Sequence, residues 1–174
     1  GYGEEKIIKG ELWKERFNQY GFGPDQSADW MWISHMWASA KDDTGRVGIV
    51  IDNGALFRGG KEKTIREKFL RDDNIECVIL LPEKIFYNTG APGAIMILNK
   101  NKREELKNKF IFINASKEFI KHPEVRRLNA LGDENIDKIV SAYNGNESED
   151  GFYRIVDINE IEENDFNLNV SLYV

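Results

Sequence analysis

Three short apolar runs restrict what this chain can fold into. Residues 46–51, 75–81 and 94–98 are of strand length and rich in Val, Ile and Leu. Continuous apolar runs of this length are typical of strands buried on both faces of a sheet. The charged segment 61–71 carries an apolar stripe and is predicted to be a helix. The chain is therefore expected to form an α/β layer.

The connections refine this topology. Residues 82–92 are too few for the crossover of a dozen or more residues that a parallel pair requires, so the second and third strands are expected to be antiparallel neighbours. A helix is predicted from Ser27 to Lys41, with Ser27 as its cap. Further elements are predicted downstream: strands at 110–114 and 152–156, a helix at 134–143 and a polar loop at 144–151.

Size and composition point to one folded domain. With 174 residues and 41% hydrophobic residues, the chain can enclose a core of its own. The single cysteine, Cys77, lies in an apolar run and is expected to be a small core residue, which fits a reducing cytoplasm. His35 and His122 are too few and too far apart to indicate a metal site. No signal peptide and no membrane-spanning run is visible, so we expect a soluble, cytoplasmic protein.

Charge is distributed unevenly along the chain. The net charge of −6 argues against a stand-alone, non-specific binder of nucleic acid. Residues 54–109 nevertheless hold 12 Lys/Arg against 8 Asp/Glu, whereas residues 133–165 hold 2 against 11. DNA, if bound, is expected to meet the middle of the chain. The acidic segment is interpreted as a surface for partner proteins, with an ordinary solvated surface as the alternative.

One generic motif is excluded by its spacing. Residues 54–61 suggest a phosphate-binding loop, because a strand leads into glycines, a lysine and a helix. The lysine comes one position late, and Glu62 stands where a hydroxyl is required. Nucleotide hydrolysis is therefore a weak alternative.

A longer set of motifs resembles a known family. In order and spacing the chain is similar, from about Leu12 to its C-terminus, to the modification (M) subunits of type I restriction-modification systems. The matching segments are Ala28–Trp30, Gly45–Ile51, Gly54–Gly60, Ile65–Arg66, Leu81–Pro92, Ile95–Lys100, Phe112–Phe119, Ile139–Tyr143 and Asn164–Asn169.

The resemblance implies a fold and a division of the chain. The fold would be the late part of a Rossmann-like sheet of an S-adenosylmethionine-dependent methyltransferase, with an antiparallel hairpin over residues 75–98. Residues 1–109 would be the C-terminal portion of the N6-adenine DNA methylase domain. Residues 110–174 would be an α/β appendage that contacts partner subunits. A sheet without its early strands would leave the strand at 46–51 with an open edge and uncovered faces, so self-association of the chain is expected.

The resemblance also implies an activity. Such subunits transfer a methyl group from S-adenosylmethionine to adenine N6 in double-stranded DNA, together with a specificity (S) subunit and with or without a restriction (R) subunit. The family's glycine-rich cofactor motif and Asn-Pro-Pro-aromatic catalytic motif do not occur in these residues. No catalytic or cofactor-binding residue is therefore assigned, and the chain alone is expected to be inactive and to bind the cofactor weakly. The alternative is a non-catalytic assembly module.

Candidate DNA-contacting residues follow from the same resemblance. In related enzymes an aromatic residue in the loop between the last two strands lies against the extruded adenine, and by position this is Phe86, with Tyr87 as its competitor. The alternative is that Phe86 covers the end of the sheet. Arg58, followed by Gly59 and Gly60 just before a helix start, is placed to meet a phosphate. The alternative there is a solvated arginine beside glycines that permit positive φ.

Overall fold

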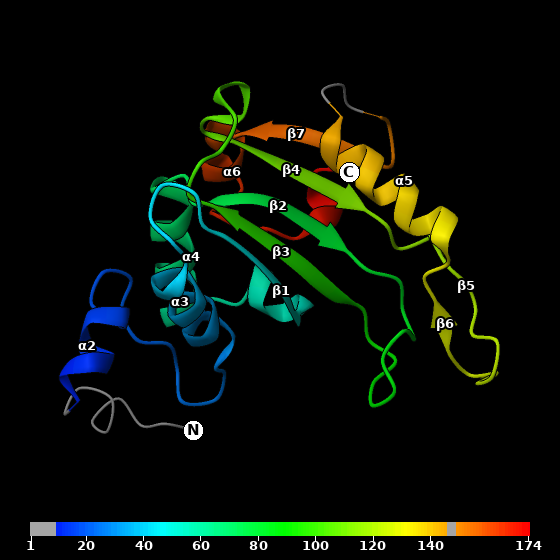
Figure 1. The fold of residues 1–174 in the computed structure, drawn as a ribbon, viewed down its shortest axis with the longest axis horizontal. Helices are drawn as coiled ribbons and strands as arrows, with labels where there is room; N and C mark the ends of the chain where they lie inside the picture. The colour runs from blue at the N-terminus through cyan, green and yellow to red at the C-terminus, as the bar shows by residue number, and fades with distance from the viewer. Residues whose placement is uncertain (1–9, 146–148) are drawn as a thin grey trace.

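A five-stranded sheet forms the centre of the computed structural model, which describes residues 10–145 and 149–174 (Figure 1). Across the sheet the order is β1, β3, β2, β4, β7. Only the β2–β4 pair is parallel, and the other three pairs are antiparallel. The strands span Arg46–Asp52 (β1), Ile75–Leu80 (β2), Gly93–Asn99 (β3), Lys109–Asn114 (β4) and Tyr153–Asp157 (β7).

Helices and a small hairpin surround this sheet. The α-helices are α2 (Glu11–Phe17), α3 (Asp29–Ser39), α4 (Lys61–Arg71), α5 (Asp133–Asn144) and α6 (Ile158–Glu163). Short 3-10 turns are η1 (Asn53–Leu56), η2 (Glu104–Leu106) and η3 (Val170–Leu172). The strands β5 (Ile120–Lys121) and β6 (Asn129–Ala130) pair only with each other. No helix in the described ranges is both long and apolar enough to cross a membrane.

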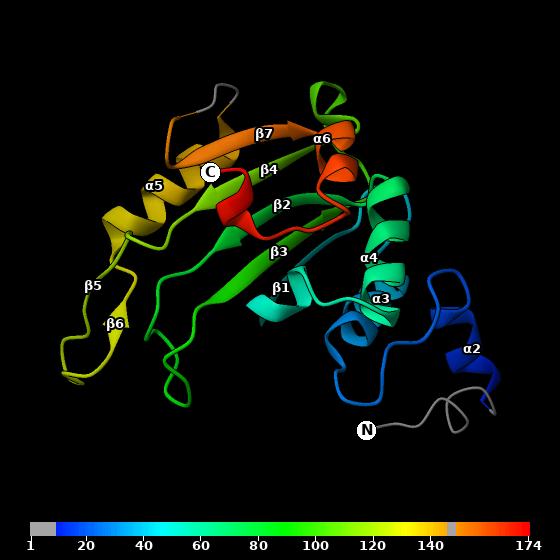
Figure 2. The same cartoon turned by 180° about the vertical axis from the view of Figure 1, so that it is seen from behind.

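The two faces of the sheet are covered differently. On one face α3, α4 and the C-terminal segment pack over all of the strands from β1 to β4, as Figure 2 shows, and form the larger core around Trp30, Phe69 and Phe112. On the other face α5 packs against β4 and contributes Ile139 and Ala142 to a second core. Covering helices on both sides explain why β2 is buried along its whole length.

The predicted α/β class and the antiparallel hairpin are confirmed. Strands β2 and β3 pair antiparallel, with Ile79 opposite Ile95, and the short connection between them makes no crossover. The helix predicted at 61–71 is α4 with the same bounds. The small β5–β6 hairpin, α2 and α6 were not predicted, because each is too short to show a clear period.

The prediction that residues 46–51 are buried on both faces is wrong. Strand β1 lies at the edge of the sheet, where Val47 and Ile51 are buried on one face and Ile49 between them is partly buried. Val50 points to the other face and is 55% exposed. The reason is that α5 reaches β4 but does not extend over β1.

The predicted cap of the second helix is also wrong. Helix α3 begins at Asp29, and its N-cap is Ala28, which makes no side-chain capping bond. The hydroxyl of Ser27 donates instead to carboxylates of Asp29 (2.9 Å) and Glu62 (2.6 Å). A capping hydroxyl would accept from a backbone N–H of the first helical turn, whereas this hydroxyl is directed at two carboxylates.

The predicted division of the chain between residues 109 and 110 falls inside one sheet. Strands β4 and β7 continue the sheet of β1–β3. The C-terminal segment enters the larger core, where the rings of Tyr173 and Phe112 stack with their centroids 4.3 Å apart. The Leu168 amide also donates to the Leu56 carbonyl at 2.9 Å. Residues 110–174 thus complete the same fold, and their contact with partner subunits stays a prediction. Within the predicted polar loop 144–151, residues 146–148 lie outside the described residues.

Cys77 is a core residue, as predicted. It lies fully buried in β2, where burial, and then the neighbouring Glu76 carboxylate, raises the pKa of the thiol well above its usual value. A thiol of this kind stays protonated at neutral pH and is a poor nucleophile.

A buried arginine joins three segments of the chain. Arg66 of α4 is 1% exposed, and its guanidinium donates to the carbonyls of Phe166 (2.8 Å), Ala55 (3.2 Å) and Arg58 (3.0 Å). Burial lowers the pKa of Arg66 to about 10, which leaves the side chain charged at neutral pH. One side chain therefore holds the turn after β1 and the C-terminal segment against α4.

Replacing this arginine should destabilise the fold. In Arg66→Met the carbonyls of Phe166 and Arg58 lose their donor, whereas that of Ala55 keeps the indole N–H of Trp30. Each buried carbonyl left without a partner costs roughly 1 to 3 kcal/mol of unfolding free energy. Urea denaturation followed by circular dichroism measures the loss.

The matched control is Arg71→Met in the same helix. Arg71 forms exposed ion pairs with Glu67 and Glu162, so its loss should shift the denaturation midpoint much less than the loss of Arg66 does. Equal denaturation midpoints for wild type and Arg66→Met would show that the three carbonyl contacts do not stabilise the fold.

Candidate nucleic-acid interface

Several chain segments meet at one end of the sheet. Strands β1, β2 and β4 run in the same direction, so their carboxyl ends lie together, and β3 begins there. This end carries η1, the loop of residues 82–92 and the β5–β6 hairpin (Figure 1). In α/β sheets, ligands bind outside the carboxyl ends of the strands. We therefore take this end as the candidate site.

Phe86 lies against the first residue of β3. A Cβ atom at Gly93 would lie only 2.8 Å from Cε2 of the Phe86 ring, so the ring covers the space that a side chain would fill. Phe86 is partly buried beside the second core and forms an isolated backbone bridge with Thr89. The sheet end thus supports the ring from one side. This geometry is compatible with base stacking and with simple packing.

Tyr87 is far more exposed than its neighbour. Its side chain is 62% exposed, and its hydroxyl lies 3.5 Å from Nε2 of His122 in the β5–β6 hairpin. Nδ1 of His122 accepts the backbone N–H groups of Glu124 and Val125, so the ring hydrogen belongs on Nε2 and faces the tyrosine. The hairpin therefore holds Tyr87 from the side.

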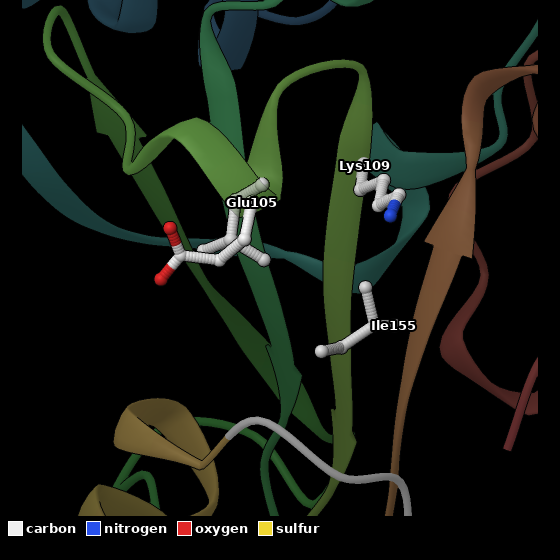
Figure 3. A pocket seen from close by; sticks show the side chains of 4 residues that line it. Glu105, Lys109 and Ile155 are labelled. Carbon is white, nitrogen blue, oxygen red and sulfur yellow. The ribbon is translucent and has the colours of Figure 1, made fainter.

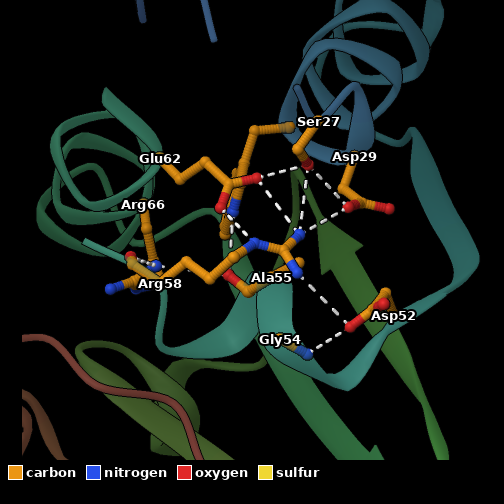
Figure 4. A network of polar contacts seen from close by, with 9 residues as sticks. Ser27, Asp29, Asp52, Gly54, Ala55, Arg58, Glu62 and Arg66 are labelled. Atoms are coloured by element: carbon orange, nitrogen blue, oxygen red, sulfur yellow. Dashed lines mark hydrogen bonds and ion pairs between the residues drawn. The ribbon is translucent and has the colours of Figure 1, made fainter. Parts of the chain in front are cut away.

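Arg58 lies in a network of carboxylates (Figure 4). Its guanidinium donates to Glu62 (2.6 Å), Asp29 (2.8 Å) and the Ser27 hydroxyl (3.1 Å), and Asp52 lies at 3.4 Å. The hydrogen bond to Glu62 is the main reason that the pKa of Arg58 is raised. The predicted phosphate contact stays a prediction, and a phosphate would compete with three carboxylates for this guanidinium.

Gly59 and Gly60 are both exposed, but they differ in backbone conformation. Gly60 has φ +65° and ψ −138° and is the N-cap of α4, a conformation that residues with a Cβ rarely adopt. Gly59 has no positive φ, and the space beside its Cα is open. The conformational explanation for a glycine thus applies to Gly60 alone.

The two predicted loops are brought together at this end. Asp52, which lies 3.4 Å from the Arg58 guanidinium, is the ladder partner of Gly93, and Gly93 contacts Phe86. Next to Asp52, the amide oxygen of Asn53 is the only buried side-chain N or O atom within residues 10–145 and 149–174 that lacks a hydrogen-bond partner. Sequence analysis did not single out Asn53, because nothing in its local pattern marks it.

The β5–β6 hairpin is a part of this end that sequence analysis missed. Asn129 binds the loop of residues 82–92 twice, through its side chain to the Glu83 carbonyl and through its backbone N–H to the Lys84 carbonyl, both at 2.8 Å. Arg127 donates to the Tyr87 carbonyl at 3.4 Å. The available signal was charge, because residues 110–132 hold four Lys/Arg against two Asp/Glu.

Two surface hollows lie away from this end of the sheet. One, of about 420 Å³, lies among Glu105, Leu106, Lys109 and Ile155 at the start of β4 (Figure 3). A second, open hollow lies near Tyr20, Trp37 and Lys100, also away from the carboxyl ends. A methyl donor must reach the base that it modifies, and neither hollow lies at the candidate site. Neither of these two hollows is therefore assigned to S-adenosylmethionine.

Comparison with known proteins establishes the family. The family profile described as N-6 DNA Methylase matches residues 2–174. The chain belongs to the N-6 DNA methylase family.

The relatives are methylase subunits of restriction systems. The chain is 57% identical, over its full length, to the MjaVII and 56% identical to the MjaVIII type I restriction enzyme methylase subunit of Methanocaldococcus jannaschii. It covers 30% and 29% of those proteins, so it spans less than a third of the length of these relatives. The likeness supports the predicted resemblance along the whole chain.

A solved structure supports the fold. The methyltransferase subunit of the type I restriction-modification system from Streptococcus thermophilus superposes with a TM-score of 0.85 at 38% identity, over 95% of this chain and 35% of that one. The predicted methyltransferase-type α/β fold is therefore confirmed.

The carboxylate network yields a test of Arg58. In Arg58→Leu the Glu62 carboxylate, 2% exposed, keeps the Ser27 hydroxyl but loses its guanidinium donor. We expect the unfolding free energy to fall by roughly 1 to 3 kcal/mol, the cost of a buried acceptor without its donor. Denaturation curves of Arg58→Leu and of Arg58→Leu/Glu62→Leu measure this, and the second substitution should recover part of the loss. An unchanged midpoint in Arg58→Leu would indicate a solvated arginine instead.

Proposed function

We propose that this chain contributes to the methylation of adenine N6 in double-stranded DNA, as part of the modification subunit of a type I restriction-modification system. The observation that carries the proposal is the Phe86–Tyr87 loop at the carboxyl ends of the strands, within a chain of this family. The relatives named above are methylase subunits, and none of them is described as a non-catalytic assembly module.

The chemistry requires that the adenine leave the helix. A methyltransferase cannot reach N6 inside the base stack, so it extrudes the nucleotide and holds the base by stacking and by hydrogen bonds to its edge. In the proposal Phe86, supported from behind by Gly93, provides the stacking face. Tyr87, more exposed and held by His122, closes the pocket from the side.

Other parts of the subunit complete the reaction in this proposal. S-adenosylmethionine supplies an activated methyl group when bound. Adenine N6 is a weak nucleophile because its lone pair is delocalised into the ring, so hydrogen-bond acceptors must orient the amino group. This chain contributes the surface that holds the base against movement while those acceptors act.

Partner subunits meet the acidic half of the chain in this proposal. Helix α5 begins with Asp133 and Glu134 and exposes Ile136 (43%) and Val140 (49%), one turn apart. Exposed apolar side chains are typical of a protein interface. The acidic residues of the same helix would repel the phosphates of DNA. We assign this surface to the specificity subunit, which would read the DNA sequence, or to a restriction subunit.

Substitution of Phe86 tests the base pocket. Stacking of a base on an aromatic ring contributes roughly 1 to 3 kcal/mol. In the complete subunit with its specificity partner, Phe86→Ala should lower methylation of duplex DNA by about ten- to a hundredfold. Affinity for S-adenosylmethionine, measured by calorimetry, should hardly change.

Conservative variants separate stacking from packing. Phe86→Trp should retain more activity than Phe86→Leu, because leucine fills space beside Gly93 but has no π face. Tyr87→Ala serves as the neighbouring comparison. If Phe86→Leu matches wild type while Phe86→Ala lowers only the melting temperature, the ring is a packing residue and the pocket assignment is wrong.

The open edge of β1 generates a second test. Unpaired strand edges associate with other chains, and Val50 adds exposed apolar surface. We expect the 174-residue chain alone to form dimers or larger species by light scattering at high concentration. Val50→Lys should shift it toward monomer, whereas Val140→Lys on α5 should not. A strictly monomeric wild-type chain would contradict this prediction.

A further inference from the structure

Figures 1 and 2 show the loop of residues 82–92 and the β5–β6 hairpin side by side at the candidate end of the sheet. We define the basic hairpin as residues 117–130, which include β5, the tip and β6. Three hydrogen bonds from Asn129 and Arg127 join it to the carbonyls of Glu83, Lys84 and Tyr87. The hairpin is therefore fixed beside the loop that carries Phe86.

The cations of the basic hairpin lack carboxylate partners. Across the described ranges most other arginines and several lysines form ion pairs, including Arg58, Lys102 and Arg154. Four exposed cations of the hairpin form none with any described carboxylate: Lys117, Lys121, Arg126 and Arg127. In an acidic protein, leaving these charges unneutralised indicates an anionic partner.

The acidic residues of the hairpin do not cancel this charge. The carboxylate of Glu118 accepts a hydrogen bond from Lys138 of α5 at 2.6 Å. Glu124 lies exposed in the tip and forms no described ion pair, so its carboxylate offsets only one of the four positive charges. The tip is thus left with the adjacent pair Arg126 and Arg127 on its surface.

We propose that the basic hairpin contacts the sugar-phosphate backbone of duplex DNA beside the extruded base, with Arg126 and Arg127 at its tip as the principal contacts. The proposal rests on the proposed function of the Phe86 loop. An extruded base remains attached to its own strand, so the phosphates on either side of it must lie near the ring that holds it. Arg127 already reaches the residue next to Phe86.

The proposal places a DNA contact outside the basic middle of the chain. Arg58, the arginine that sequence analysis selected, is occupied by carboxylates, whereas Arg126 has no described side-chain partner. Guanidinium groups bind phosphate through paired N–H donors, and such contacts position DNA without reading its sequence. The hairpin would therefore strengthen binding equally on all sequences.

Arg126→Gln in the complete subunit with its specificity partner is the direct test, because this substitution removes no contact described within the chain. Fluorescence anisotropy should show roughly tenfold weaker binding to a labelled duplex, the cost of one charge-assisted contact. The slope of log affinity against log salt concentration should fall by about 0.9. The loss should be similar on the recognised sequence and on a scrambled duplex.

Three further variants make the outcome specific. Arg126→Lys should restore most of the salt dependence, and Arg126→Gln/Arg127→Gln should lose more affinity than Arg126→Gln. Lys107→Gln serves as the matched control, because Lys107 is an exposed lysine at the opposite end of β4. It should leave affinity and slope unchanged.

The possible failures are distinguishable. If the wild-type complex binds DNA and Arg126→Gln changes neither affinity nor salt slope, the hairpin proposal is overturned while the Phe86 pocket stands. If Arg126→Gln instead weakens assembly with the specificity subunit, the hairpin is a protein interface and the proposal is overturned. If the wild-type complex binds no duplex at all, the proposed function itself fails.

Discussion

The buried guanidinium of Arg66 is the contact on which the arrangement of this chain depends. It is 1% exposed and binds carbonyls from the turn after β1, from the loop before α4 and from the C-terminal segment. A buried charge is tolerated only when its donors are satisfied, so these three segments must adopt one arrangement together. Because one of the carbonyls belongs to Arg58, the same contact fixes the backbone from which the carboxylate network extends.

The end of the sheet that carries the candidate site is built from contacts at short range. Gly93 lets the Phe86 ring approach the backbone of β3, and its ladder partner Asp52 connects to the Arg58 network. Asn129 then ties the hairpin to the same loop. The loop of residues 82–92 is thus held from the sheet and from the hairpin. Such support matters for a base pocket, since stacking requires a ring that stays in place.

Charge is separated in space in a way that the net value of −6 conceals. Several cations within the fold are matched by carboxylates, as Arg58 is by Glu62 and Lys102 is by Asp73. The acidic surplus lies on α5 and the segments after it, and four exposed cations that form no described ion pair lie in the hairpin beside Phe86. An acidic protein can therefore present one surface to DNA and another to proteins, because fields at salt concentrations of the cell fade over about 8 Å.

The sequence by itself determined the elements whose signal is local. The apolar run at 75–81 and the short connection 82–92 specify a buried strand and its antiparallel partner, and the stripe of α4 specifies a helix. Tertiary structure alone decided that one face of β1 is left exposed at Val50, that Arg58 lies among carboxylates and that the hairpin adjoins Phe86. These three depend on contacts between residues far apart in the chain, and a local pattern carries no information about which distant residue becomes the neighbour.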